Sequence, residues 1–220
     1  MKKIVIGVMV LLSLTNMVFS LEETWLSIGV NFGNYFENES DAENFYAGYL
    51  GVNFGGYGFW NKRNIGIFFN YGLLFPVVDS IKNNYKPIIQ GDFILGPGFR
   101  YNINEKLKLH FGIGLDINLL SLLDRTNIDV KTSDERIALG LGGDIGLKYD
   151  ITDVIYFNIG TALSYNFASY RERKSTLDNW TNTKRESSNW INGYSMVGIR
   201  PYIAIGFNYY QEKGKRGKPE

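Results

Sequence analysis

Apolar and polar residues alternate with a period of two along most of the chain, most clearly between Leu107 and Leu119. Every odd position of this segment is apolar, whereas the even positions hold glycines and polar residues such as His110 and Asp116. Because successive side chains of a β-strand point to opposite faces, the pattern predicts a strand with two chemically different faces. The same sequence wound as an α-helix would have no apolar stripe.

The alternation recurs in eight segments of the chain. They lie near residues 25–32, 45–54, 65–73, 89–100, 107–119, 137–149, 155–167 and 197–209. A tilted strand of about 9–11 residues crosses the apolar core of a bilayer, so these segments have roughly the length that a membrane-spanning strand needs.

The two faces of the predicted strands differ in size as well as in polarity. One face carries large aliphatic and aromatic residues, and the other is dominated by Gly, Ala, Ser and Asn with a few charges. In a soluble β-sandwich, the alternative fold, the second face would meet water and carry more Lys, Glu, Arg and Thr. Small residues instead suit the interior of a narrow barrel, and large aliphatic residues suit lipid. We therefore predict an all-β fold, a closed antiparallel up-and-down transmembrane β-barrel of about eight strands.

The connections between the predicted strands alternate in length. Short polar connections fall at 61–64, 102–106 and 150–153, and long, mostly charged ones at 34–44, 77–87, 120–136 and 168–192. Outer-membrane barrels have short periplasmic turns and long extracellular loops. The pattern predicts a bacterial outer-membrane protein with both termini in the periplasm and four long loops outside the cell.

The two ends of the chain differ from the predicted barrel. Lys2 and Lys3 precede an apolar stretch over 4–19, which is followed by the small residue Ser20, as in a secretory signal peptide. An uncleaved membrane helix is the alternative, but the stretch is shorter than the roughly 20 apolar residues that such a helix needs. We expect a cleaved signal peptide over 1–20, a barrel over 21–210, and a basic, disordered periplasmic tail over 211–220.

Composition narrows the classes of partner. The net charge is +1, so the chain has no general affinity for nucleic acid, and we expect none as a partner. The chain has no Cys, and therefore no disulfide stabilises it.

The last predicted strand ends in an aromatic run with glycine, Gly206-Phe207-Asn208-Tyr209-Tyr210. With the signal peptide, the strand number and the unequal connections, this makes the chain resemble the eight-stranded outer-membrane barrels typified by the OmpA barrel domain, OmpX and OmpW. The resemblance implies outer-membrane lipid as surroundings and the barrel-assembly machinery, which recognises such a terminal strand, as a partner during insertion. It also implies that passage of small hydrophobic solutes, as in OmpW, is an alternative function.

Seven charged residues fall on the predicted inward face. They are Asp92, Arg100, Lys108, Asp116, Asp144, Lys148 and Arg200. They either line a pore or form a paired structural network that fills the lumen. Buried charges need partners and eight strands leave little space, which favours the network. We expect Asp144 to pair with one of the four cations in this set.

The chain offers little for catalysis. His110, the one histidine, would need an orienting acid such as Asp116 and a serine nucleophile, and no nucleophile motif is present. No phosphate-binding loop, metal-ligand cluster or dinucleotide motif occurs, so we expect no cofactor and no metal. The prediction is a protein that is not an enzyme, with a membrane-embedded acyltransferase or hydrolase as the third hypothesis.

The last long connection holds a group of cations and tryptophans that could contact an extracellular ligand. They are Arg171, Arg173, Lys174, Trp180, Lys184, Arg185 and Trp190. Aromatic residues beside cations can bind a carbohydrate, a lipid head group or a host protein, whereas the alternative is a solvated loop whose tryptophans pack locally. The leading functional hypothesis is a structural or adhesin-like surface-interaction barrel, ahead of the passage of small hydrophobic solutes.

Overall fold

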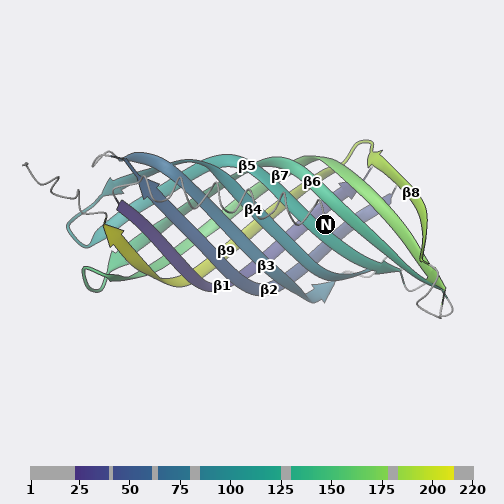
Figure 1. Ribbon diagram of the computed structural model, residues 1–220, viewed down its shortest axis with the longest axis horizontal. Helices are drawn as coiled ribbons and strands as arrows, with labels where there is room; N and C mark the ends of the chain where they lie inside the picture. Colours follow the sequence, from purple (N-terminus) through teal and green to yellow (C-terminus); the bar gives the residue numbers. More distant parts are fainter. Residues whose placement is uncertain are drawn as a thin grey trace, which may run out of the picture.

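The computed structural model describes residues 23–39, 42–60, 64–79, 85–124, 130–177 and 183–210. The predicted signal peptide and tail lie outside these residues. Nine strands within them form one sheet: β1 (Glu23–Glu39), β2 (Ala42–Phe59), β3 (Ile65–Asp79), β4 (Tyr85–Asn102), β5 (Leu107–Asp124), β6 (Val130–Asp150), β7 (Ile155–Leu177), β8 (Thr183–Ile191) and β9 (Ser195–Tyr210) (Figure 1). No helix in the described parts of the chain is long and apolar enough to cross a membrane.

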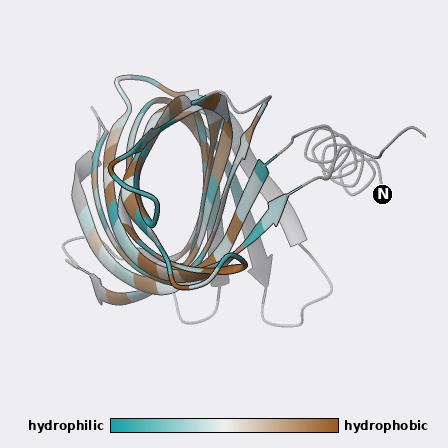
Figure 2. Cartoon of the chain, turned by 90° about the vertical axis from the view of Figure 1, so that its left-hand side faces the viewer, coloured by the Kyte–Doolittle hydropathy of each residue, from teal (hydrophilic) through white to brown (hydrophobic). Residues whose placement is uncertain are grey.

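Eight of these strands close into a barrel. Strands β1 to β7 pair antiparallel in chain order, β7 pairs with β9, and β9 pairs with β1. The remaining strand, β8, pairs with β7 beyond the end of β9. Viewed along its axis, the barrel is a closed ring (Figure 2). The predicted fold class, a closed antiparallel up-and-down transmembrane β-barrel, is confirmed.

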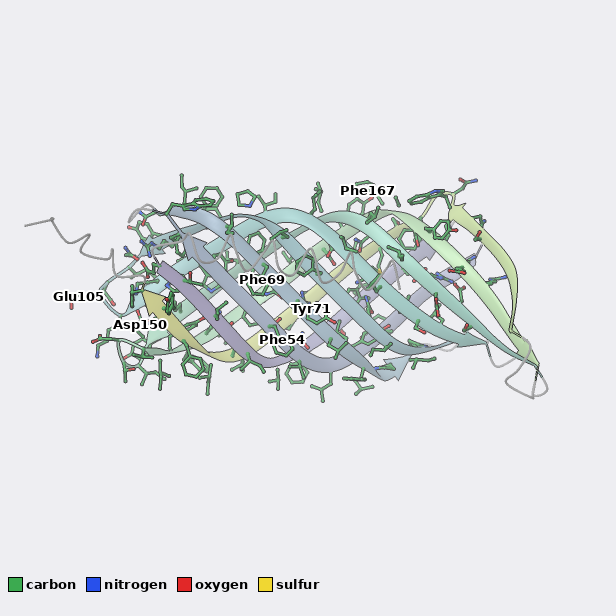
Figure 3. All side chains as sticks on the ribbon, viewed as in Figure 1. Phe54, Phe69, Tyr71, Glu105, Asp150 and Phe167 are labelled. Atoms are coloured by element: carbon green, nitrogen blue, oxygen red, sulfur yellow. The ribbon has the colours of Figure 1, made fainter. Side chains whose placement is uncertain are left out.

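The two faces of each strand lie as the alternation predicts. On β5 the side chains of Ile113 and Leu115 point outward and are 60% and 69% exposed, whereas those of His110 and Asp116 point inward and are buried. The outer surface carries apolar side chains on every barrel strand, Phe54 and Phe167 among them (Figure 3). Such a surface suits hydrocarbon rather than water.

The interior is richer in large side chains than the sequence predicts. One buried cluster comprises Trp25, Tyr57, Phe59, Phe68, Ile94, Tyr156 and Ala162. A second comprises Tyr35, Ala47, Tyr49, Leu74, Ala138, Tyr194 and Met196. The inward glycines make room for these groups, because a Cβ atom on Gly142 would lie 2.8 Å from the side chain of Ile94 and one on Gly112 would strike the ring of Phe68. Small residues on some strands thus accommodate large residues from others.

The strands extend farther at one end of the barrel than at the other. At the shorter one, here called the turn end, lie the short turns over 103–106 and 151–154 and both ends of the described chain, where Glu23 pairs with Tyr210. At the other, the hairpin end, strands β6 to β8 continue past the rest as an extension, visible at the right of Figure 1. The pairing of β6 with β7 reaches as far as Val130 and Leu177.

The predicted long loops over 34–44, 77–87, 120–136 and 168–192 are wrong in extent, because most of their residues belong to strands. For example, β1 runs to Glu39 and β2 starts at Ala42. The strands continue there because antiparallel pairing satisfies backbone N–H and C=O groups whatever the side chains are. An alternation of apolar residues detects only the portions that have one apolar face.

Candidate functional site

The barrel interior is the candidate site, since it collects most of the buried polar groups of the described residues. At the turn end, Arg100 forms an ion pair with Glu23, and its guanidinium carbon lies 4.5 Å from the centre of the Phe59 ring. Lys108 and Lys148 both form ion pairs with Asp150, which lies at the turn end (Figure 3). These three cations are therefore paired with carboxylates from the ends of β1 and β6.

The Trp25 side chain lies among these three cations. Its ring centre is 4.5 Å from Lys148 Nζ, 5.8 Å from Lys108 Nζ and 5.9 Å from Arg100 Cζ. A cation within about 6 Å of an indole ring is attracted to its face. The indole thus lies beside all three cations and, with the buried rings next to it, fills this end of the lumen.

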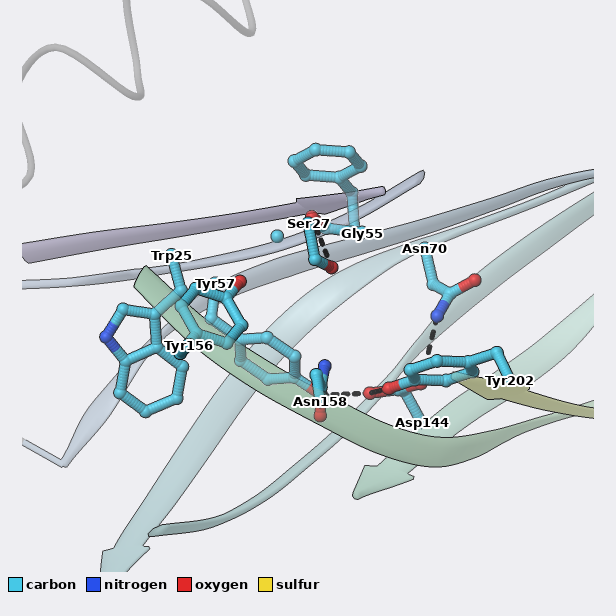
Figure 4. A pocket seen from close by; sticks show the side chains of 11 residues that line it. Trp25, Ser27, Gly55, Tyr57, Asn70, Asp144, Tyr156, Asn158 and Tyr202 are labelled. Carbon is cyan, nitrogen blue, oxygen red and sulfur yellow. Dashed lines mark hydrogen bonds between the residues drawn. The ribbon is translucent and has the colours of Figure 1, made fainter. Parts of the chain in front are cut away.

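Asp144 lies deeper in the barrel and accepts hydrogen bonds from neutral groups. Tyr57 Oη donates at 2.6 Å, Asn70 Nδ2 at 3.0 Å and Tyr202 Oη at 3.2 Å (Figure 4). His110 Nδ1 lies 3.3 Å from Asp144 Oδ2. The expectation that Asp144 pairs with a lysine or arginine of the predicted set was wrong. Three donors on one carboxylate replace the hydration that a charged group loses on burial.

A small cavity adjoins Asp144. Its lining includes Ser27, Tyr57, Asn158 and Tyr202 (Figure 4). The space available to the centre of a water molecule is about 10 Å³, which is room for about one water. The cavity is therefore too small to hold a substrate.

The remaining inward charges gather nearer the hairpin end. Arg200 Nε lies 3.7 Å from Asp92 Oδ2, and Arg200 Nη1 donates to Asn53 Oδ1 at 3.1 Å. Tyr35 donates its hydroxyl hydrogen bond to Asp92, and Asn166 donates to Asp116 at 2.6 Å. All seven residues of the predicted inward set thus have side chains on the inner face, in three separate groups rather than one network.

A further cluster of charges, absent from the predicted inward set, lies in the extension. Arg136 forms ion pairs with Glu37 and Asp134, and Arg171 Nε and Arg173 Nε lie 3.1 Å and 3.7 Å from Asp134 Oδ2. Arg171 and Arg173 belong to the predicted ligand-contact surface, but here they point to the inner side. The cause is a bulge between β6 and β7 at Leu139 and Gly140, which shifts the alternation of β7 by one residue.

Of the other members of the predicted contact surface, only Trp190 has a side chain among the described residues. Trp190 on β8 is 57% exposed, and its ring packs edge-on against Tyr170 with the centres 5.7 Å apart. Trp180 lies outside the described residues, as do the side chains of Lys174, Lys184 and Arg185, whose backbones belong to β7 and β8. Among the described side chains of the predicted set, Arg171 and Arg173 therefore lie on the inner side of the sheet and Trp190 on its outer side.

His110 is completely buried between orienting groups. Its Nε2 atom lies 2.8 Å from Asn158 Oδ1, its Nδ1 atom faces Asp144, and the Tyr57 ring packs against the imidazole with the centres 4.6 Å apart. No serine hydroxyl contacts His110 in the described part of the chain, so these residues contain no nucleophile–base pair around it. They also hold no group of three or more His, Cys, Asp or Glu side chains that could bind a metal ion.

This architecture, eight strands around a lumen filled by side chains, defines the class of small outer-membrane-type β-barrels. No family model and no curated protein sequence matches the chain.

Solved structures share the fold. OprG from Pseudomonas aeruginosa is 8% identical with a TM-score of 0.55, and the match covers 87% of this chain and 98% of that one. A major outer membrane protein from Thermus thermophilus is 12% identical with a TM-score of 0.53, covering 84% and 99%. The outer membrane protein AlkL, solved in lipid bilayers, is 15% identical with a TM-score of 0.50, covering 91% and 94%. At these identities the likeness shows the fold alone, and it confirms the predicted resemblance at that level.

The ion pairs of Asp150 generate a stability prediction. Replacing Asp150 by Ala leaves the buried Lys148 and the partly exposed Lys108 without their carboxylate. Removing one partner of a fully buried pair typically costs about 3–5 kcal/mol, and because water partly reaches Asp150 we expect a loss in the free energy of unfolding near the lower end of that range. Urea unfolding of the barrel in detergent micelles measures it. Asp153→Ala, an exposed position in the adjoining turn, is the matched control and should leave the stability unchanged; equal stability of both variants would contradict the account.

Proposed function

We propose that this chain is an outer-membrane barrel with a structural and surface-interaction role, in which a closed lumen supports a sheet that rises above the membrane. The observation that carries the proposal is the filling of the lumen. The buried cluster that contains Trp25, the buried cluster that contains Met196 and the inward charged groups together occupy the barrel interior. Eight strands leave an interior just wide enough for side chains. A barrel filled in this way serves as a rigid anchor.

Two observations support the outer membrane as the location. The outward side chains form an apolar surface around the whole barrel, and the solved proteins that share the fold are outer-membrane proteins. On this proposal the partners are outer-membrane lipid and, during insertion, the barrel-assembly machinery. The terminal strand β9 would be the element that this machinery recognises, with Phe207 and Tyr209 pointing outward.

The extension is the proposed contact surface. It is stiffened by antiparallel pairing of β6 to β8 and by the ion pairs around Asp134, and it presents Trp190 and Tyr170 on its outer side. On this proposal the extension lies outside the cell, while the turn end and both termini lie in the periplasm. A paired sheet offers a preorganised surface, which reduces the entropy lost when a ligand binds.

Site-specific labelling tests this placement, because the chain contains no native Cys. Ser188→Cys lies exposed on β8, and Glu105→Cys lies exposed in the turn over 103–106. A membrane-impermeant maleimide applied to intact bacteria should label position 188, and should label position 105 only after the outer membrane is permeabilised. Labelling with the opposite preference would overturn the proposed orientation, and recovery of the protein as a soluble periplasmic species would overturn the location.

A second candidate function, passage of small hydrophobic solutes, is favoured by a break in the barrel wall. Pairing between β3 and β4 stops at Leu74 and Gln90, although β3 continues to Asp79 and β4 starts at Tyr85. Pro76 and Pro87, which lack an N–H donor, flank the break on the two strands.

The borders of this break are apolar. Phe75, Val77 and Ile88 are 49%, 63% and 47% exposed. Each strand instead follows its other neighbour there, β3 pairing with β2 as far as Asp79 and β4 with β5 from Tyr85. An apolar solute could therefore reach the hairpin end of the barrel from the side.

A crosslink across the break separates the two candidates. Pro76→Cys and Ile88→Cys stand at positions that would be opposite each other if the ladder continued. If small hydrophobic solutes pass through the break, joining the two cysteines with a short bifunctional maleimide should slow the uptake of an apolar fluorescent solute into liposomes that contain the protein. The same double variant without the crosslinker is the control. Equal uptake with and without the crosslink would remove the second candidate.

A further inference from the structure

Several oxygen atoms in the lining of the cavity beside Asp144 have no hydrogen left to donate (Figure 4). The hydroxyl hydrogens of Tyr57 and Tyr202 are donated to Asp144, and that of Ser27 is donated to the backbone oxygen of Gly55 at 3.3 Å. These three hydroxyl groups can therefore offer only lone pairs to a species in the cavity.

Asn70 adds an acceptor that has no partner of its own. Its side chain is 2% exposed and belongs to the lining of the cavity. Its Nδ2 atom donates to Asp144 at 3.0 Å, whereas its Oδ1 atom is buried without a hydrogen-bond partner. Because an unpaired buried carbonyl oxygen is costly, this atom indicates a bound species in the cavity.

Asp144 brings a negative charge to the same cavity. Among the described residues no lysine or arginine lies within ion-pair distance of its carboxylate, and the one basic group at such a distance is His110, through Nδ1 at 3.3 Å. The guanidinium of Arg200 faces another carboxylate, that of Asp92. The three hydrogen bonds to Asp144 replace its hydration but do not remove its charge, and an uncompensated buried charge is destabilising.

We propose that this cavity binds one monovalent alkali cation, sodium or potassium, between the Asp144 carboxylate, Asn70 Oδ1 and the hydroxyl oxygens of Ser27 and Tyr57. Carbonyl oxygens can replace the hydration shell of such cations in proteins. The cavity has room for about one water molecule, so the cation binds without its hydration shell. One carboxylate balances one positive charge, which favours a monovalent cation over calcium, whose sites have six to eight oxygen ligands.

A water molecule is the alternative occupant of the cavity. It would donate to two of the acceptors and leave the charge of Asp144 unbalanced, whereas a cation attracts all of the acceptors and neutralises the carboxylate. The cation is part of the packing of the lumen, so the proposal does not depend on what the extension contacts.

The dependence of stability on the type of salt tests the proposal. A cation that binds only the folded barrel raises the folding equilibrium constant, by about tenfold for each tenfold increase in cation concentration above the dissociation constant. Urea unfolding in detergent micelles is measured in sodium, potassium and choline chloride at equal ionic strength, because choline is too large for a cavity that holds one water. The wild type should be more stable in sodium or potassium chloride than in choline chloride.

Two variants assign the effect to this cavity. Asp144→Asn removes the charge and should make the stability equal in the three salts, whereas Asp116→Asn, a similarly buried position outside the cavity lining, should keep the difference. Ser27→Ala removes one oxygen atom and should raise the cation concentration needed for a given stabilisation several-fold. Ser164→Ala, a buried position that does not line the cavity, is its matched control and should leave that concentration unchanged.

The measurement on the wild type requires no variant, and it stands even where Asp144→Asn fails to fold. Equal stability of the wild type in the three salts would overturn the proposal and leave the cavity to a water molecule. A salt effect that persists in Asp144→Asn, or that Ser27→Ala leaves unchanged, would also overturn it, because the cation would then bind elsewhere on the barrel.

Discussion

The space enclosed by eight paired strands is so narrow that the side chains of the strands must fill it, and this constraint shapes the rest of the molecule. A large inward group on one strand requires a small one on another, which is why Gly112 and Gly142 lie against Phe68 and Ile94. The large aliphatic residues are consequently left for the outer surface. Lipid compatibility and a filled interior are therefore two results of one alternating sequence pattern.

The same constraint governs the polar groups. Each charge that enters the lumen loses water, and the described residues compensate for that loss in different ways. Asp150 forms ion pairs with two lysines at the turn end, whereas Asp144 accepts hydrogen bonds from neutral hydroxyl and amide donors. Asp92 faces Arg200 and accepts from the Tyr35 hydroxyl, and Asp116 accepts from the Asn166 amide. The charges in the lumen are thus compensated in separate local groups and do not form a continuous charged path.

The alternation of residues predicted the fold class and the inward face of all seven charged residues, because side-chain direction in a strand follows from sequence position. The alternation does not predict with which residues these seven charged side chains form ion pairs or hydrogen bonds. Glu23 and Asp150 lie at strand ends, where the alternation does not distinguish the two faces, and Asp144 meets groups that become neighbours through the closure of the barrel. Arg171 and Arg173 were predicted on a loop surface because residues 168–192 show no apolar alternation, and the bulge that turns them inward has no signature in a single sequence. The paired extension was missed because its strands lack an apolar face.

The central claim is that the interior is closed by its own side chains, and the absence of native Cys allows a direct measurement. Ser164 lies buried on the inner face of β7, and Ser164→Cys changes its size little. The rate at which a small, water-soluble thiol reagent modifies this cysteine in the folded barrel reports whether water reaches the lumen. The account predicts strong protection that is lost on unfolding, compared with rapid modification of Glu105→Cys in the exposed turn. Modification of position 164 in the folded protein as fast as that of position 105 would contradict it.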